Sequence, residues 1–215
     1  PYEILKYLFT KTGLFTSTIA EAGAFIKTKD ELDIPNIQFH YAPAMIVDHG
    51  RTLLWGTGMS CHSCLLRPKS LGEVTLASSD PFADPLIDPK FLSHPDDMKD
   101  MIDGYKVMMR VLGSEPFSKY ITEHTQRPID INNDADIEQA MREGADTVYH
   151  PVGTCKMGDD DMSVVDSRLK VHKLNGLRIV DASIMPTIVG GNTNAPTIMI
   201  GEKASDMILE DWNIH

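Results

Sequence analysis

Apolar residues recur at intervals of three and four after Ser93, and this spacing predicts an amphipathic helix. Ser93 and Asp96 form an S-x-x-D capping signature at its start, and Gly113 follows its end. The apolar stripe consists of Met98, Met101, Ile102, Tyr105, Met108, Met109 and Leu112. Methionine-rich faces also occur in binding grooves, but the regular spacing favours core packing here. We therefore assign the stripe no chemistry.

Three further helices are indicated by weaker patterns. A cap at Asn133 or Asp134 begins one helix, which reaches Glu143 before Gly144 ends it. Its inward-facing residues are expected to be Ile137, Ala140 and Met141. The other two helices are expected over residues 3–9 and 196–209.

Strands are expected where apolar and aromatic residues alternate between turn residues. One covers residues 37–47, and Pro43 bends or ends it. Two more, over 53–67 and 72–77, are separated by a turn at 68–72, so we predict a hairpin. Together with the helices, these strands predict an α+β fold in which helices pack on an antiparallel or mixed sheet.

Composition narrows the classes of protein further. Of the 215 residues, 42% are hydrophobic and 24% are charged, as in a globular protein of one large or two small units. The net charge is −11, from 20 basic and 31 acidic residues, and no run of basic residues occurs. We therefore expect no nucleic-acid partner, because its phosphates would be repelled. No apolar run approaches the roughly 20 residues that cross a bilayer.

Three cysteines, Cys61, Cys64 and Cys155, are too few for a secreted disulfide framework, which favours a reducing, cytoplasmic compartment. Cys61 and Cys64 do not suggest a metal site, because alternation on a strand points them to opposite faces. The acidic cluster at 159–161 lacks the alternating ligands of a calcium loop. We expect no metal ion.

One histidine is distinguished by the proline that follows it. In the segment TVYHPVGTCKMG, Pro151 favours an extended conformation at His150 and presents its ring from a loop. Gly153 permits a close approach of the backbone to a ligand. Imidazole as a class is suited to general-base work near neutral pH. The residues alone equally allow a packed or capping histidine.

A strand, a polar turn and a helix are expected near the C-terminus. The strand covers residues 177–180, and Pro196 lies at the start of the helix. The free N–H groups and the dipole at such a helix start attract negative charge. The turn carries Asn192, Thr193 and Asn194 rather than a P-loop lysine. A ring carbonyl or a developing oxyanion therefore suits it as well as a phosphate.

Several separated blocks resemble the C-terminal signature of the glucose-methanol-choline (GMC) flavin oxidoreductases. In order along the chain, they are YHPVGTCKMG, VVDSRLKV, GLRIVDASIMP and GNTNAPTIMIGEKASDMI. Earlier segments, PKSLGEVTLAS and DPLIDPKFL among them, resemble the substrate-binding domain of the same family. Within the family, the chain looks closest to bacterial choline dehydrogenase-like enzymes and alcohol dehydrogenases.

The resemblance implies an FAD-dependent enzyme that oxidises a primary alcohol, either choline-like or aliphatic. It assigns the proton-abstracting base to His150 and the second catalytic position to Asn192, whose amide cannot titrate. The residues that match flavin-contacting positions are Asp181, Ala182, Thr193 and Asn194. The residues that match substrate-facing positions are Val148 and, more loosely, His40 and Tyr41. Simpler roles also fit: a turn cap for Asp181, a helix cap for Asn194 and a half-buried strand position for His40.

The flavin-binding half of this family carries a G-x-G-x-x-G turn, which does not occur here. The chain also begins with Pro1 rather than Met, so we expect the carboxyl half of a longer enzyme. We expect a substrate-binding domain over 1–146 and, over 147–215, the catalytic loop and a segment that completes the FAD-binding domain. The implied partners are the N-terminal half with most of the FAD, a small alcohol, a quinone or oxygen as electron acceptor, and further copies in a homo-oligomer.

Two other functions fit the same residues. An FAD-containing hydroxynitrile lyase-like enzyme would keep the cofactor without redox turnover, and the isolated chain would otherwise be a non-catalytic binding module. The chain alone is expected to be inactive and largely free of flavin. Association of the complete enzyme with a membrane stays open.

Overall fold

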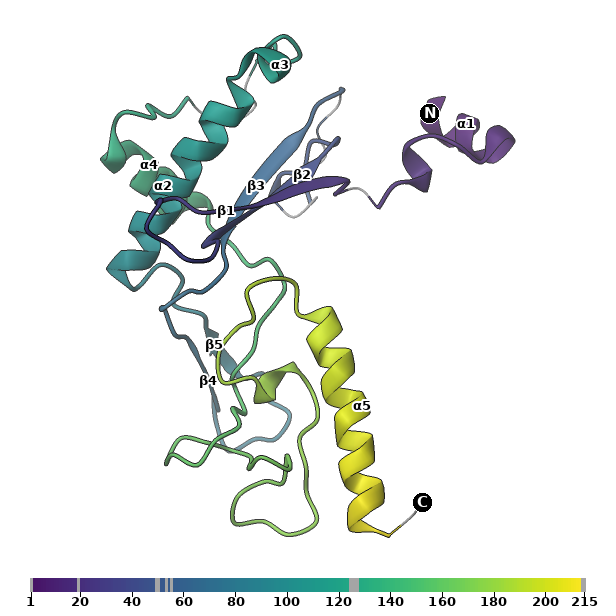
Figure 1. Ribbon diagram of the computed structural model, residues 1–215, viewed down its shortest axis with the longest axis vertical. Helices are drawn as coiled ribbons and strands as arrows, with labels where there is room; N and C mark the ends of the chain where they lie inside the picture. The colour runs from purple at the N-terminus through teal and green to yellow at the C-terminus, as the bar shows by residue number, and fades with distance from the viewer. Residues whose placement is uncertain are drawn as a thin grey trace. The chain divides into compact units, whose positions relative to one another are not determined.

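The computed structural model describes residues 2–18, 20–48, 51–52, 54, 56–123 and 128–213. The chain forms two compact units, and its elements are labelled in Figure 1. The first unit comprises Pro1–Leu65 and Lys99–Gln139, and the second comprises Leu66–Met98 and Ala140–His215. Each unit therefore combines two separate stretches of sequence. The predicted division at residue 146 stays a prediction.

The first unit contains a three-stranded antiparallel sheet in the order β1-β2-β3. Its strands are β1 (Ala22–Ile26), β2 (Ile37–Ala42) and β3 (Ser60–Leu65). The central strand β2 pairs through Phe39 with Ala24 on one side and Ser63 on the other. It ends directly before Pro43, as predicted, because proline cannot donate to the ladder.

Helix α2 (Pro95–Leu112) supplies the apolar face that packs against this sheet. Met108 is buried in one cluster with Ile37 and Phe39 of β2. Gly104 allows this close approach, since a Cβ there would lie 3.0 Å from Ile37 Cγ1. The methionine stripe is therefore core, which confirms the interpretation made from its spacing, and the sheet-and-helix arrangement confirms the predicted α+β class.

The remaining helices of the first unit are short, and helix α4 continues into the second unit. They are α1 (Tyr2–Thr10), η1 (Leu14–Thr16), α3 (Glu115–Ser118) and α4 (Asp134–Gly144). In α4, Ile137 and Met141 are buried, as the sequence predicted.

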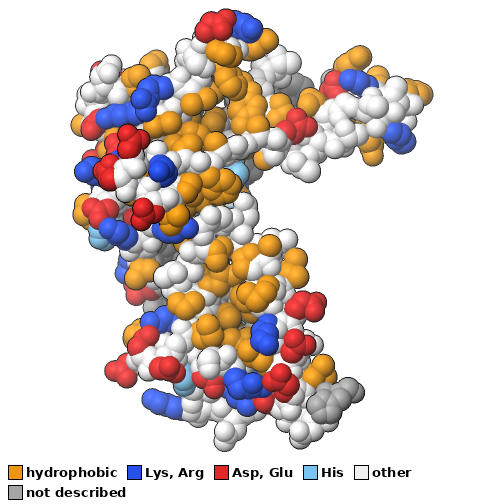
Figure 2. Space-filling view, in the orientation of Figure 1, with side chains coloured by type: hydrophobic (Ala, Val, Ile, Leu, Met, Phe, Trp, Pro, Cys, Tyr) orange, Lys and Arg blue, Asp and Glu red, His pale blue; other side chains and the backbone are white. Residues whose placement is uncertain are grey.

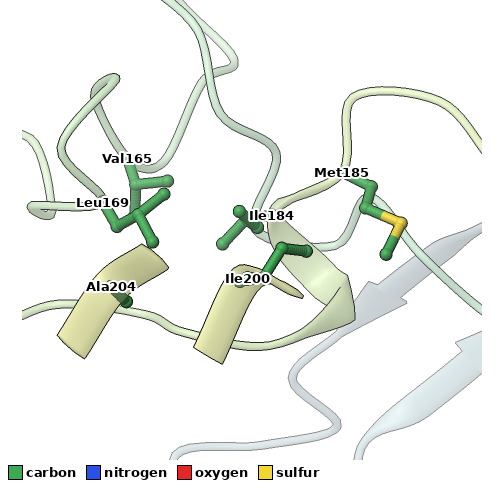
Figure 3. Close-up of a cluster of buried hydrophobic side chains, with 6 residues drawn as sticks. All are labelled: Val165, Leu169, Ile184, Met185, Ile200 and Ala204. Atoms are coloured by element: carbon green, nitrogen blue, oxygen red, sulfur yellow. The ribbon is translucent and has the colours of Figure 1, made fainter. Parts of the chain in front are cut away.

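The second unit contains little regular structure apart from one long helix. Its elements are β4 (Glu73–Thr75), β5 (Leu86–Asp88), η3 (Ala182–Ile184) and α5 (Asn194–Asp211). The buried face of α5 presents Ile200 and Ala204 to Val165, Leu169, Ile184 and Met185 (Figure 3). This cluster ties the irregular segments to a rigid helix.

The C-terminal end of α5 is held by an ion-pair network. Asp211 forms ion pairs with Arg168 Nη2 at 2.8 Å and Lys170 Nζ at 2.5 Å, and a third with Arg178. Hydrogen bonds from Lys170 and Arg178 hold the pKa of Asp211 well below its usual range. A carboxylate at a helix C-terminus is otherwise unfavourable, because it faces the negative end of the helix dipole. The cations offset that effect and fix the helix end to the loop over 166–178.

The predicted hairpin around residues 68–72 is wrong. Strand β3 pairs with β2, whereas β4 pairs with β5, a strand that the sequence did not reveal. Among the described residues, β3 begins at Ser60, and the N-terminal end predicted for that strand, at Leu53, lies outside them. The turn is fixed by Asp97 instead, whose buried carboxylate accepts hydrogen bonds from the N–H groups of Lys69 and Ser70.

The strand predicted over 177–180 is also wrong. Its described residues form only an isolated bridge, between Lys170 and Arg178, and Leu177 and Val180 are exposed. None of the helices within the described ranges combines the length and the apolar composition that crossing a membrane requires.

Candidate active site

His150 lies in a loop of the second unit, outside any helix or strand, as the proline after it predicted. The preceding residue, Tyr149, has a φ of 65°, in the left-handed region that bulky side chains rarely adopt. Its N–H group donates to Thr147 Oγ1 at 2.9 Å. A strained residue directly before His150 turns the chain sharply, and this turn sets the direction in which the imidazole leaves the backbone.

The chain after His150 is anchored to the segment that contains η3. Cys155 N donates to Ser183 O at 3.0 Å, and Met157 N donates to Ile184 O at 2.8 Å. Gly153 has a φ of 88°, a conformation that favours glycine. Residues 146–157, the histidine loop, contain neither helix nor strand. These bonds fix the position of the histidine loop on the segment that contains η3.

Both ring nitrogens of His150 lie within hydrogen-bond distance of the turn before α5. Nε2 is 2.8 Å from Nδ2 of Asn192, and Nδ1 is 3.0 Å from Oγ1 of Thr193. The predicted base and the predicted second catalytic residue, which are 42 residues apart in sequence, thus meet directly. Their catalytic roles stay predictions.

Thr193 is the N-cap residue of α5, and its side chain makes no capping bond to the helix. A capping threonine normally accepts a hydrogen bond from a helix N–H group, which is worth about 1 kcal/mol. Here the hydroxyl bonds to His150 instead. The first N–H groups of α5 thereby keep their donor capacity for an electron-rich group outside the helix.

The other residues predicted to contact flavin have defined local roles. Asp181 caps η3, because its Oδ1 accepts hydrogen bonds from Ser183 N at 2.7 Å and Ser183 Oγ at 2.5 Å. Ala182 is the first residue of η3 and packs against the buried cluster of the second unit. Asn194 is the first residue of α5 and is exposed, while Thr193 occupies the cap position that was considered for it. Contact of these residues with flavin stays a prediction.

The predicted substrate-facing residues belong to different units. Val148 lies two residues before His150 and is 38% exposed. His40 and Tyr41 lie on β2 of the first unit. The Tyr41 hydroxyl donates to Met59 Sδ at 2.5 Å, and its ring meets Phe117 edge-on at 5.8 Å. Their role in an alcohol pocket stays a prediction.

Sequence reasoning missed Arg67. A Cβ on Gly190 would lie 2.2 Å from Nη2 of Arg67, so this glycine lets the guanidinium pass close to the backbone two residues before Asn192. The only sequence signal was the Gly190-Gly191 pair, which indicates close approach but not the approaching group.

The acidic loop is organised by one carboxylate. Asp160 accepts hydrogen bonds from Lys156 Nζ at 2.8 Å, Ser163 Oγ at 2.9 Å and Met162 N at 2.9 Å. The Lys156 bond and its neighbours lower the pKa of Asp160 to about 2. Across the described ranges, no three His, Cys, Asp or Glu side chains are arranged to hold a metal ion.

The thiols of Cys61 and Cys64 lie on β3 and form no disulfide. Burial raises the pKa of each thiol. Both are therefore poor nucleophiles at neutral pH, because the thiolate is the reactive form.

Comparison with known proteins gives one family and several close relatives. A family model described as GMC oxidoreductase matches residues 68–201. An alcohol dehydrogenase [acceptor] from Pseudomonas putida is 46% identical over 206 residues, which is 96% of this chain and 37% of that protein. An oxygen-dependent choline dehydrogenase from Klebsiella pneumoniae subsp. pneumoniae is 42% identical over 94% of this chain and 37% of its own length. The chain thus spans little more than a third of these relatives.

Among solved structures, a variant of formate oxidase from Aspergillus oryzae RIB40 superimposes with a TM-score of 0.88 and 24% identity. The match covers the whole of this chain and 42% of that protein. At this level of identity the likeness concerns the fold alone.

Proposed function

We propose, because the chain belongs to the GMC oxidoreductase family, that it is the C-terminal part of an FAD-dependent enzyme. The proposed enzyme oxidises a primary alcohol, either choline-like or aliphatic, and passes the electrons to a quinone or oxygen. His150 acts as the base, and Asn192 binds the substrate oxygen. We expect an N-terminal half of the same enzyme to hold most of the FAD.

The direct contact between His150 and Asn192 is the observation that carries the proposal. Asn192 Nδ2 and His150 Nε2 lie 2.8 Å apart, and a substrate hydroxyl that replaces this direct bond can donate to the imidazole and accept from the amide. The imidazole then accepts the hydroxyl proton, and the amide holds the oxygen while negative charge develops on it. A positioned base typically accelerates such a step by about 10²–10⁴-fold.

The donor set at the start of α5 fits an electron-rich ring such as the pyrimidine edge of a flavin. When bound, FAD supplies the acceptor for the hydride that leaves the alcohol carbon. Thr193 leaves the helix N–H groups uncapped, and Asn194 is exposed beside them. These residues would orient the ring and favour negative charge on it, through the positive end of the helix dipole.

Exposed apolar side chains support contact with a further part of the enzyme. Apolar surface is visible over the N-terminal half of α5 in Figure 2, where Ile198 and Met199 are 59% and 58% exposed. Clustered apolar side chains at a surface are typical of faces that a partner covers.

Anaerobic titration of the flavin-loaded, full-length protein with choline and with alcohols of increasing length tests the proposal. We expect bleaching of the flavin absorbance by at least one primary alcohol. Absence of bleaching across the whole panel would contradict alcohol oxidation, and cyanide release from a cyanohydrin in the same sample would support a hydroxynitrile lyase instead.

A further inference from the structure

We propose that Thr193 is a positioning residue for His150: its hydroxyl accepts the Nδ1 proton and keeps Nε2 unprotonated and turned towards the substrate. This inference deepens the proposed function and depends on it, because it concerns the base that the function requires. This role of the Thr193 hydroxyl is additional to the predicted contact of Thr193 with flavin, which stays a prediction.

The two hydrogen bonds of the ring determine where its proton lies. The neighbour of Nε2 is an amide nitrogen, which donates and cannot accept, so Nε2 carries the lone pair. In a neutral imidazole the proton is then on Nδ1, where Thr193 Oγ1 lies 3.0 Å away as an acceptor. Within the described part of the chain, the ring has these two partners, and neither is charged.

The backbone of Thr193 is firmly held, so its hydroxyl has a defined direction. Its carbonyl oxygen accepts hydrogen bonds from Thr197 N at 3.0 Å and Thr197 Oγ1 at 2.7 Å. The residue is 7% exposed, and α5 is anchored two turns later by buried Ile200 and Ala204. A hydroxyl at an N-cap normally serves its own helix. Here the Thr193 hydroxyl is hydrogen-bonded to the imidazole of His150 instead.

This arrangement allows the proton transfer to proceed without rearrangement at Nδ1. The alcohol hydroxyl first takes the place of the Asn192 N–H at Nε2. Its O–H bond then breaks, and the proton adds to the lone pair of Nε2. A bound oxidised flavin would take the hydride from the carbon that carries this oxygen. The imidazolium then carries a proton on each nitrogen. The proton on Nδ1 continues to donate to Thr193 Oγ1, so the same bond orients the ring before and after the transfer.

Three variants of the flavin-loaded, full-length protein separate this role from a purely structural one. Thr193→Val removes the acceptor but keeps the shape of the side chain, and Thr193→Ser restores the acceptor. Thr75→Val is the matched control, since it removes a hydroxyl from an exposed residue of β4 in the same unit. Flavin content and thermal unfolding are measured for each variant, so that a folding defect is recognised.

In Thr193→Val we expect flavin reduction by the alcohol to slow by about 10-fold, as for loss of one hydrogen bond to a charged group. The apparent dissociation constant of the alcohol should change by less than about 2-fold. Thr193→Ser should recover most of the rate, and the flavin of Thr75→Val should be reduced at close to the wild-type rate. A wild-type rate in Thr193→Val, or a rate in Thr193→Ser as low as in Thr193→Val, would overturn the proposal.

A second measurement does not depend on turnover and is made on the wild-type protein, with one variant used only to assign the signal. Two-bond ¹H–¹⁵N spectra of the ¹⁵N-histidine-labelled protein report which ring nitrogen carries the proton, and comparison with His150→Gln identifies the signal. We expect the Nδ1-protonated form in the wild type. The Nε2-protonated form would overturn the proposal. If His150→Ala leaves flavin reduction unchanged, the proposed function itself is wrong; if only Thr193→Val leaves it unchanged, this inference alone is wrong.

Discussion

The two units of the chain reach a defined structure by different means. In the first unit, three paired strands and the apolar face of α2 form a regular core around Ile37. In the second, long irregular segments are held by single backbone bonds, such as that from Met157 N to Ile184 O, and by one helix. The residues that suit chemistry gather in the second unit, where His150 meets the start of α5.

The difference shows that a loop can hold its side chains in positions as well defined as those on a strand. In a regular sheet, many equivalent backbone hydrogen bonds hold each strand. The loss of one side chain therefore leaves the positions of the other residues nearly unchanged. The histidine loop depends on a few specific devices: the left-handed Tyr149, the bonds to the η3 segment and the anchoring of α5. Functional residues often occupy loops that a rigid scaffold positions.

The strongest test of this comparison uses the same substitution in both cores. Ile37→Ala and Ile200→Ala each remove a buried isoleucine, and each should cost about 2–5 kcal/mol of unfolding free energy. Because Ile200 anchors the helix that carries Thr193, only Ile200→Ala should also slow flavin reduction, by about 10-fold or more. Urea unfolding and stopped-flow reduction of the full-length protein measure both effects. Equal slowing by Ile37→Ala would remove the distinction between the units.

A smaller effect is expected from the strained residue before His150. Tyr149→Gly should be more stable than Tyr149→Ala by about 0.5–1 kcal/mol, because only glycine adopts a φ of 65° without a steric cost. Both variants lack the phenol, so the comparison isolates the backbone. At Thr154, an exposed residue of the same loop without a positive φ, the alanine variant should be at least as stable as the glycine variant. The same order at both positions would argue against strain at Tyr149.

The smallest effect concerns the loop around Asp160. An aspartate in an unfolded chain has a pKa of about 4, whereas Lys156 and its neighbours hold the pKa of Asp160 at about 2. The stabilising contribution is therefore complete above about pH 4 and is lost as the pH falls towards about 2. Thermal unfolding of wild type and Asp160→Asn should differ at neutral pH and converge in acid. The control, Asp161→Asn, should follow the wild type; a gap for Asp160→Asn that persists at about pH 2 would contradict this account.

Periodicity in the sequence predicted the helices better than the strands. The stripe in α2 repeats over 18 residues, which leaves little ambiguity. Strand β1 reads AGAFI and contains mostly small residues, and β5 has three residues between two prolines. Such short strands obtain their structure from the partner strand, so the predicted hairpin joined segments that pair elsewhere.

The site was predicted from the order of motifs rather than from spacing. Nothing local indicates that His150 and Asn192 meet, since folding of the whole second unit brings them together. The bond from Thr193 to the ring was not predicted, because the direction of a hydroxyl depends on the turn before α5. Arg67 was missed for the same reason: the glycine that accommodates it reveals space and not its occupant.

The most direct test of the central claim is the rate of anaerobic flavin reduction in His150→Ala. If His150 removes the hydroxyl proton, the full-length variant should bind flavin normally yet be reduced by a primary alcohol at least about 100-fold more slowly than the wild type. Reduction at close to the wild-type rate, with intact flavin binding, would contradict the assignment of His150 as the base.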